Sequence, residues 1–118
     1  MTRLERILLH ILSVAERGLG RTEIVKLCYL VDVESMRLTG QTMIGTQFVR
    51  YRYGPYSAGV VSSLEDLVSS DLAVSAGGWY FSRSDAPKTD GELTSEESNT
   101  IEDVVRRYRS LRLGRLKQ

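Results

Sequence analysis

Apolar residues in the first 40 positions of the chain recur at the three- and four-residue spacing of amphipathic helices. The first stretch predicts a helix that ends near Gly18, and its apolar positions are Leu4, Ile7, Leu8, Ile11, Leu12 and Ala15. Thr22 is placed to cap a second helix, which runs to Gly40. The apolar face of this second helix comprises Ile24, Leu27, Cys28, Val31 and, at its far end, Leu38. The chain is therefore expected to begin with two helices.

Two more helices are predicted later in the chain. Ser57 is a suitable N-cap for a helix that ends near Ser70, with apolar positions at Val60, Val61, Leu64, Leu67 and Val68. A last helix opens near Thr94 or Ser95, where two glutamates favour the positive end of a helix dipole. Its predicted core positions are Ile101, Val104, Val105, Tyr108 and Leu111.

Between these helices, β-branched and aromatic residues indicate extended structure. Residues 43–53 are predicted to be extended, and Gly54 with Pro55 is predicted to turn the chain into the helix that follows. Residues 72–75 and 79–83 are predicted to pair as a hairpin, because the two glycines between them tolerate positive φ. A polar loop is expected after this hairpin, at residues 84–92.

This order of elements predicts an α+β fold: a mostly helical, winged-helix-like single domain with a short strand and a small β-hairpin. A chain of 118 residues suffices for one hydrophobic core. We assign residues 1–110 to the domain and residues 111–118 to a basic C-terminal tail.

Composition agrees with a globular protein, because 42% of the residues are hydrophobic and 26% are charged. The single cysteine, Cys28, cannot form an internal disulfide, and its apolar helical setting favours a buried structural thiol over a nucleophile. No apolar run approaches the roughly 20 residues that span a bilayer, and the N-terminus lacks the features of a signal peptide. We therefore expect a cytoplasmic protein with no membrane partner.

The winged-helix order invites a test for DNA binding. The helix in the recognition position, residues 57–70, contains no Lys or Arg, and it carries Glu65 and Asp66 with Asp71 just beyond. Helices that enter the major groove present basic or amide side chains to base edges, whereas an acidic helix is repelled by the phosphates. The net charge of +1 adds no general attraction. Nucleic-acid binding through this helix is therefore expected to be weak.

The charge near the C-terminus is unevenly distributed. Every charged residue from 84 to 105 is acidic apart from Lys88. Every charged residue from Arg106 onward is basic, including Arg112 and Arg115. The helix dipole explains acids at the start of the last helix and bases at its end. The basic end is either a solvated helix end or a contact surface for nucleic acid or an acidic protein, and the pattern leaves both open.

The extended segment is a second candidate surface. Alternation along a strand would place Phe48, Arg50 and Arg52 on one face and the intervening residues on the other, so that one face is packed and the other is cationic. A joint partner-binding site is predicted where this strand adjoins the second helix, comprising Lys26, Tyr29, Asp32, Arg50, Arg52, Tyr53 and Tyr56. For each residue taken singly, a structural role is the alternative.

The predicted hairpin offers a possible secondary surface. Of its two adjacent aromatic residues, Trp79 and Tyr80, one is expected to pack inward and the other to be exposed. Together with Arg112 and Arg115, the exposed residue would extend the contact area.

Catalysis finds little support in the sequence. The one histidine, His10, lies in an apolar helical stretch, where a partly buried imidazole is favoured over a catalytic base. No Cys and His spacing suits zinc, and no glycine-rich loop follows a strand to hold phosphate. We expect a protein that is not an enzyme and needs no cofactor.

One combination of motifs is typical of a known family. A helix with Lys-Leu-x-Tyr and a following Asp is succeeded by a turn glycine, an extended segment and Tyr-Gly-Pro. The residues that carry this pattern are Lys26, Leu27, Tyr29, Asp32, Gly40, Tyr51, Tyr53, Gly54 and Pro55. In their order and spacing, over roughly residues 4 to 110, they resemble the Panacea or SocA-like domain, also called the phage-associated GepA type, of bacterial and phage antitoxins and proteolytic adaptors.

The resemblance implies a protein-binding module whose partner is a cognate toxin. It implies either direct neutralisation of that toxin or, as in SocA-like members, its delivery to an ATP-dependent protease. The alternative from a different class is a winged-helix transcriptional regulator that binds nucleic acid through its wing and basic tail. Phosphate contacts would make such binding fall steeply as the salt concentration rises.

Overall fold

The computed structural model describes residues 1–52, 54–83 and 93–116, with side chains in the last helix described as far as Arg109. Within these residues the helices are α1 (Arg3–Ala15), α2 (Arg21–Thr39), α3 (Ala58–Ser69) and α4 (Ser95–Leu116). The strands are β1 (Leu19–Gly20), β2 (Val49–Tyr51), β3 (Gly54–Tyr56), β4 (Ala73–Ala76) and β5 (Trp79–Ser82). The predicted loop at 84–92 lies outside the described residues.

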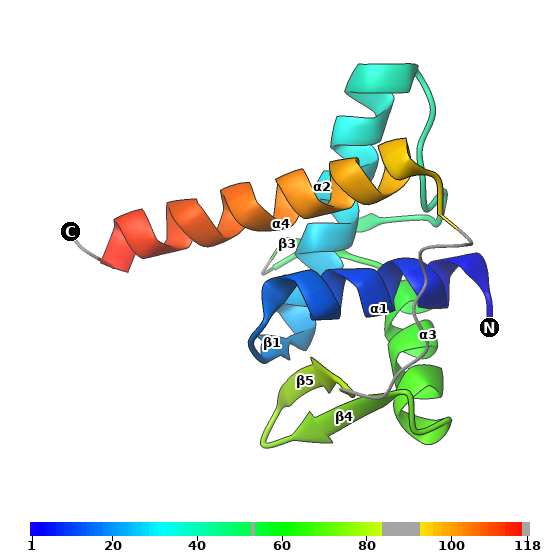
Figure 1. The fold of residues 1–118 in the computed structure, drawn as a ribbon, viewed down its shortest axis with the longest axis vertical. Coiled ribbons are helices and arrows are strands. Elements are labelled where there is room, and N and C mark those ends of the chain that lie inside the picture. The colour runs from blue at the N-terminus through cyan, green and yellow to red at the C-terminus, as the bar shows by residue number, and fades with distance from the viewer. Residues whose placement is uncertain (53, 84–92, 117–118) are drawn as a thin grey trace.

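The strands form two small antiparallel sheets. The first is three-stranded in the order β1-β5-β4, and the second is the β2–β3 hairpin. Figure 1 shows the four helices making up most of the molecule, with the sheets at its periphery. The predicted α+β class and single domain are confirmed. The backbone of α4 continues past residue 110 to Leu116, and the domain boundary at 110 stays a prediction.

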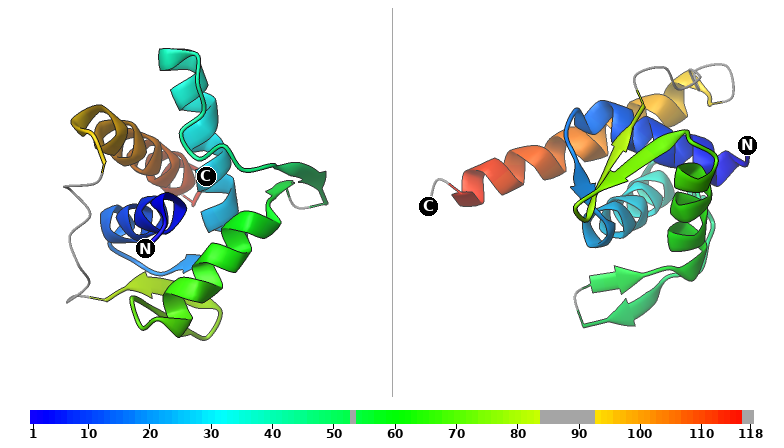
Figure 2. Two further views of the ribbon diagram at one scale, coloured as in Figure 1. Left: turned by 90° about the vertical axis from the view of Figure 1, so that its right-hand side faces the viewer. Right: turned by 90° about the horizontal axis from the view of Figure 1, so that it is seen from below.

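The core is built around α1, which contacts the other three helices and strand β5 of the three-stranded sheet (Figure 2). Its apolar positions Ile7, Leu8 and Ile11 have no exposed surface. They meet the apolar sides of α2, α3 and α4, where Leu27, Leu64 and Ile101 are equally buried. The helical spacing of apolar residues therefore predicted most of the core-facing positions of the four helices, and the side chain of the predicted core residue Leu111 lies outside the described residues.

Side-chain caps fix several helix starts. Thr2 accepts the backbone N–H of Glu5, whose carboxylate accepts the N–H of Thr2, so α1 begins with a reciprocal capping box. Thr94 and Glu97 form the same arrangement at the start of α4. Ser57 accepts the N–H of Val60 and caps α3, as predicted.

Two predictions for α2 were wrong. Its N-cap is Gly20, two residues before the predicted Thr22, because the carboxylate of Glu23 reaches back to accept the Gly20 N–H at 3.1 Å. Leu38 is 56% exposed, since the end of α2 extends beyond the body of the protein. The buried face of α2 ends at Ser35, earlier than the apolar pattern indicated.

The region 43–56 also differs from its prediction. Among the described residues of the predicted extended segment, only Val49–Tyr51 is strand, and Gly54-Pro55 is part of β3 instead of a turn into α3. The register pairs Val49 with Tyr56 and Tyr51 with Gly54. Both Val49 and Tyr51 are exposed, so the prediction of one packed face was wrong.

Gly54 has φ +118°, a torsion that L-residues with a side chain rarely adopt. Gly54→Val is expected to lower the free energy of unfolding by about 1–3 kcal/mol through backbone strain. An added Cβ meets no atom within 4 Å outside its chain neighbours, so the effect is attributed to the torsion and not to a close contact of the Cβ. Chemical denaturation followed by circular dichroism measures it.

The matched control is Gly20→Ser. Gly20 has φ −74°, and an added Cβ comes no closer than 3.8 Å to the Glu23 carboxylate. This variant is expected to unfold like the parent protein, since Ser is a favoured N-cap residue. Equal stability of the two glycine variants would show that the Gly54 torsion is not demanding.

Candidate functional site

The connection from α2 to β2 is anchored by Asp32, which is only 6% exposed. Its carboxylate accepts the backbone N–H groups of Met43 at 2.9 Å, Ile44 at 2.7 Å and Gly45 at 3.1 Å. Hydrogen bonds to an ionised acceptor are stronger than those between neutral groups. Asp32 therefore holds the returning chain against α2, one turn after Tyr29.

Two further contacts position the start of the hairpin. The Phe48 ring packs edge-on against the Tyr29 ring, with centroids 5.6 Å apart and planes at 74°. The Thr46 hydroxyl lies 3.3 Å from the Ser57 hydroxyl, which also caps α3. The β2–β3 hairpin thus leaves the body between α2 and α3 at a defined place.

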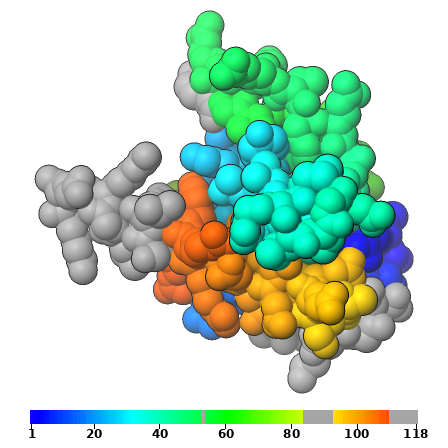
Figure 3. Space-filling view, turned by 90° about the horizontal axis from the view of Figure 1, so that it is seen from above, coloured from blue at the N-terminus to red at the C-terminus, as the bar shows by residue number. Residues whose placement is uncertain are grey.

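The hairpin itself projects from the body, as Figures 2 and 3 show. By its register, Val49, Tyr51 and Tyr56 share one face, while Arg50 lies opposite Pro55 on the other. The Tyr51 and Tyr56 rings are 5.5 Å apart, and Tyr51 is 65% exposed. We call this region the hairpin surface, and its exposed members are Arg21, Tyr29, Val49, Arg50, Tyr51, Arg52 and Tyr56.

A small pocket of about 170 Å³ lies between the hairpin and the start of α2. Its lining residues are Arg21, Thr22, Val25, Tyr51, Gly54, Pro55 and Tyr56. The Arg21 guanidinium donates to the Tyr80 hydroxyl at 3.3 Å, and this hydrogen bond raises the pKa of Arg21. The pocket therefore combines carbon-rich walls with a permanent positive charge.

The structure brings together part of the predicted site and separates the rest. Tyr29, Arg50, Arg52 and Tyr56 belong to the hairpin surface, whereas the Lys26 ammonium lies 5.7 Å from the Tyr108 ring centroid, toward α4. The carboxylate of Asp32 is buried beneath the connection, so its observed role is positioning. Tyr53 lies outside the described residues.

Sequence reasoning missed four of the pocket residues as functional candidates: Arg21, Thr22, Val25 and Tyr51. A signal was available, because Thr22, Val25 and Tyr29 stand at the i, i+3, i+7 spacing of one helix face. The preference of Thr for N-cap positions assigns Thr22 to capping instead. Strand alternation places Tyr51 on the face opposite the arginines, which is expected to be packed, since the protrusion of the hairpin is not a local property.

The secondary surface divides at β5. Trp79 is 43% exposed and Tyr80 is 7% exposed, so one ring packs inward and the other is exposed, as predicted. The side chains of Arg112 and Arg115 lie outside the described residues, and their role stays a prediction.

On α3, Glu65 and Asp66 are exposed, and Arg83 after β5 pairs with Asp71 at 2.6 Å. These acids weigh against a duplex approaching along α3 and the β4–β5 hairpin.

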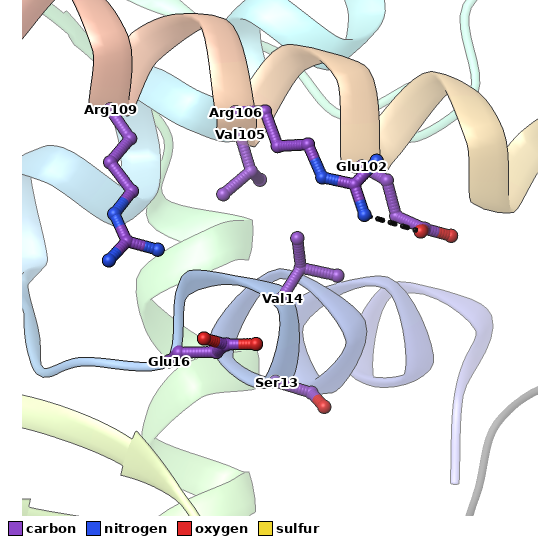
Figure 4. Close-up of a pocket in the computed structure, with 7 residues that line it drawn as sticks. All are labelled: Ser13, Val14, Glu16, Glu102, Val105, Arg106 and Arg109. Atoms are coloured by element: carbon purple, nitrogen blue, oxygen red, sulfur yellow. Dashed lines mark hydrogen bonds and ion pairs between the residues drawn. The ribbon is translucent and has the colours of Figure 1, made fainter.

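A second, larger pocket of about 460 Å³ lies between the end of α1 and the middle of α4. Ser13, Val14 and Glu16 face it from the α1 side. Figure 4 shows Arg106 paired with Glu102, and Arg109 extending from α4 toward the α1 end. Two acids and two arginines line this pocket, so its charges balance and favour neither anions nor cations.

The chemically reactive side chains are poorly placed for catalysis. Cys28 has no exposed surface, and burial, reinforced by the charge of Asp32, raises the pKa of its thiol well above the ordinary range. His10 Nε2 is buried without a hydrogen bond, 3.5 Å from the Glu102 carboxylate. Among the described residues, no three His, Cys, Asp or Glu side chains are grouped to hold a metal ion. None of the described helices is long and apolar enough to cross a membrane.

Comparison with known proteins gives one result. Residues 24–118 match the family model described as Antitoxin SocA-like, Panacea domain. The matched region begins in α2 and includes the hairpin surface apart from Arg21, together with α3, the β4–β5 hairpin and α4. Searches of curated proteins and of solved structures found no significant match.

Proposed function

This chain belongs to the family of SocA-like antitoxins with a Panacea domain, and on that premise we propose that it neutralises its toxin by binding it directly through the hairpin surface. The family establishes an antitoxin role in general terms and makes a non-enzymatic role the expected one. The observation that supports the hairpin surface is its exposed aromatic side chains, Tyr51 and Tyr56, beside a preformed pocket.

Exposed aromatic and arginine side chains of this kind are typical of protein interfaces. Tyr and Arg are enriched at the residues that contribute most binding energy, and such residues tend to lie next to pockets. The projecting hairpin also presents its strands to a partner without rearrangement of the core. Three anchors hold it in place: Asp32, the Tyr29–Phe48 contact and the Thr46–Ser57 contact.

Delivery of the toxin to an ATP-dependent protease is the finer alternative within the same family. Both modes require toxin binding, but they differ in what happens to the toxin afterwards. Direct neutralisation leaves the amount of toxin in the cell unchanged, whereas an adaptor lowers it. Immunoblotting of the toxin during co-expression, in cells with and without the protease, separates the two modes.

The test of the proposed function uses the toxin encoded beside this gene. Tyr51→Ala and Arg50→Ala are each expected to raise the dissociation constant at least about 30-fold, equivalent to about 2 kcal/mol, and to abolish growth protection. Both side chains are exposed, so the melting temperature is expected to stay within about 2 °C of the parent. Calorimetry and a growth assay measure the two effects.

Phe81→Ala and Arg109→Ala are matched controls, because they remove an exposed aromatic and an exposed arginine from other parts of the protein. Both controls are expected to protect cells fully. If the controls lose binding and the hairpin variants keep it, the interface lies elsewhere. If the parent protein neither binds nor neutralises this toxin, direct neutralisation of it is wrong.

A further inference from the structure

The arginines of the hairpin lack the acidic neighbours that most other exposed arginines have. Arg3, Arg37, Arg106 and Arg107 each pair with a carboxylate. In the described part of the chain, Arg50 and Arg52 have no ion pair, and the sequence contains no Asp or Glu from residue 35 to residue 64. The β2–β3 hairpin therefore carries positive charge that the protein does not balance locally.

The pocket at the base of the hairpin suits one bulky apolar side chain. Val25, Tyr51, Pro55 and Tyr56 contribute carbon-rich walls to a volume of about 170 Å³. Arg21 stands at the edge of this space, held by its hydrogen bond to Tyr80. An apolar group that entered the pocket would lie beside Arg21, and the residues next to it in the partner would reach the arginines of the hairpin.

We infer that the partner presents a large apolar side chain flanked by carboxylates, with the apolar group in the pocket and the carboxylates paired with Arg21, Arg50 and Arg52. This inference deepens the proposed function and rests on it, because it specifies the chemistry of the toxin segment that the hairpin surface binds. Charge complementarity of this kind accelerates association and excludes partners with basic surfaces.

A single-stranded nucleic acid is the competing ligand, since tyrosines and arginines also bind bases and phosphates. The pocket favours a protein instead. Among the described residues that line it, Arg21 is the one basic residue, and the walls are carbon-rich, so the pocket suits a single apolar side chain and does not form the continuous basic groove that a nucleic-acid backbone follows.

The experiment uses fluorescein-labelled peptides of about 12 residues, a length that spans one interface segment, as probes of the full chain. The first has a central Trp with Asp and Glu on both sides, the second has Ser in place of Trp, and the third has Lys in place of every acid. A single-stranded oligonucleotide of similar length is the fourth probe. Fluorescence anisotropy is measured at about 50 and about 300 mM salt, because the added salt weakens contacts between exposed charges and leaves apolar contacts largely unchanged.

The acidic Trp peptide is expected to bind at least about tenfold more tightly than either altered peptide and than the oligonucleotide, and to weaken with salt. The double variant Arg50→Glu with Arg52→Glu is expected to reduce this binding at least about tenfold. Arg106→Glu with Arg109→Glu changes the net charge equally on α4 and is expected to have little effect. Circular dichroism confirms that each variant is folded.

Tighter binding of the basic peptide or of the oligonucleotide would overturn the inference, as would undetectable binding of the acidic Trp peptide at millimolar concentration. Equal effects of the two double variants on binding of the acidic Trp peptide would also overturn the inference, because the attraction would then depend on the net charge of the protein and not on the hairpin. These readouts need no toxin. Growth protection that persists while the peptides fail leaves the proposed function standing, and peptide binding without toxin neutralisation contradicts the proposed function instead.

Discussion

Asp32→Ala is expected to lower the free energy of unfolding by about 3 kcal/mol, because it removes an ionised acceptor from three backbone N–H groups. The loss is large where the orphaned donor is buried, as at Met43, and smaller at exposed Gly45, where water replaces the carboxylate. Denaturant unfolding measures the change. The connection to the hairpin is expected to loosen as well, which native-state hydrogen exchange at residues 43–45 would detect.

Two substitutions serve as comparisons. Asp32→Asn keeps one carbonyl oxygen for Met43 and Ile44 but directs an amide toward the Gly45 N–H, so an intermediate loss is expected. Asp66→Ala removes an exposed carboxylate and is expected to change stability by less than about 0.5 kcal/mol. If Asp32→Ala were as stable as Asp66→Ala, the anchoring role assigned to Asp32 would be wrong.

Cys28 is expected to react with a thiol reagent at least about a thousandfold more slowly in the native protein than in the denatured chain. The thiol has no exposed surface, and its raised pKa keeps it protonated at neutral pH, so neither access nor the reactive thiolate is available until the core opens. The rate of colour release from an aromatic disulfide reagent measures this protection.

The same assay reports on Asp32. If labelling proceeds through unfolding, a loss of about 3 kcal/mol in Asp32→Ala accelerates it roughly 100-fold. The double variant Cys28→Ser with Ser62→Cys places a thiol on the exposed side of α3, where rapid labelling is expected. Labelling of native Cys28 as fast as this control would mean that the centre of α2 opens locally and is not part of the rigid core.

The helical framework was predictable because its signals are local. The apolar stripe of α1, the cap at Ser57 and the hairpin at Gly77 and Gly78 each depend on residues a few positions apart. The N-cap of α2 shows the limit of this reasoning, because it is Gly20 and not the predicted Thr22. A glycine N-cap offers no side chain, and the stabilising group was Glu23, three residues downstream.

The candidate site was harder to predict because its members differ in burial, which is a tertiary property. Tyr29 and Asp32 lie one turn apart on α2, and spacing alone assigned both to a surface. The chain returning at residues 43–45 covers Asp32 and leaves Tyr29 40% exposed. Similarly, alternation in β2 correctly grouped Val49 with Tyr51, but no local pattern states whether another element covers that face.

Because the β2–β3 hairpin projects from the body, its exposed residues and the residues that stabilise the fold are subject to different selection. Its exposed side chains contribute little to the core, so substitutions at Val49, Arg50 or Tyr51 are expected to change stability only slightly. The anchors that orient the hairpin lie instead in α2 and in the residues just before β2. If the hairpin is the recognition surface, as proposed, partner specificity can change through substitutions at the hairpin while the scaffold stays constant.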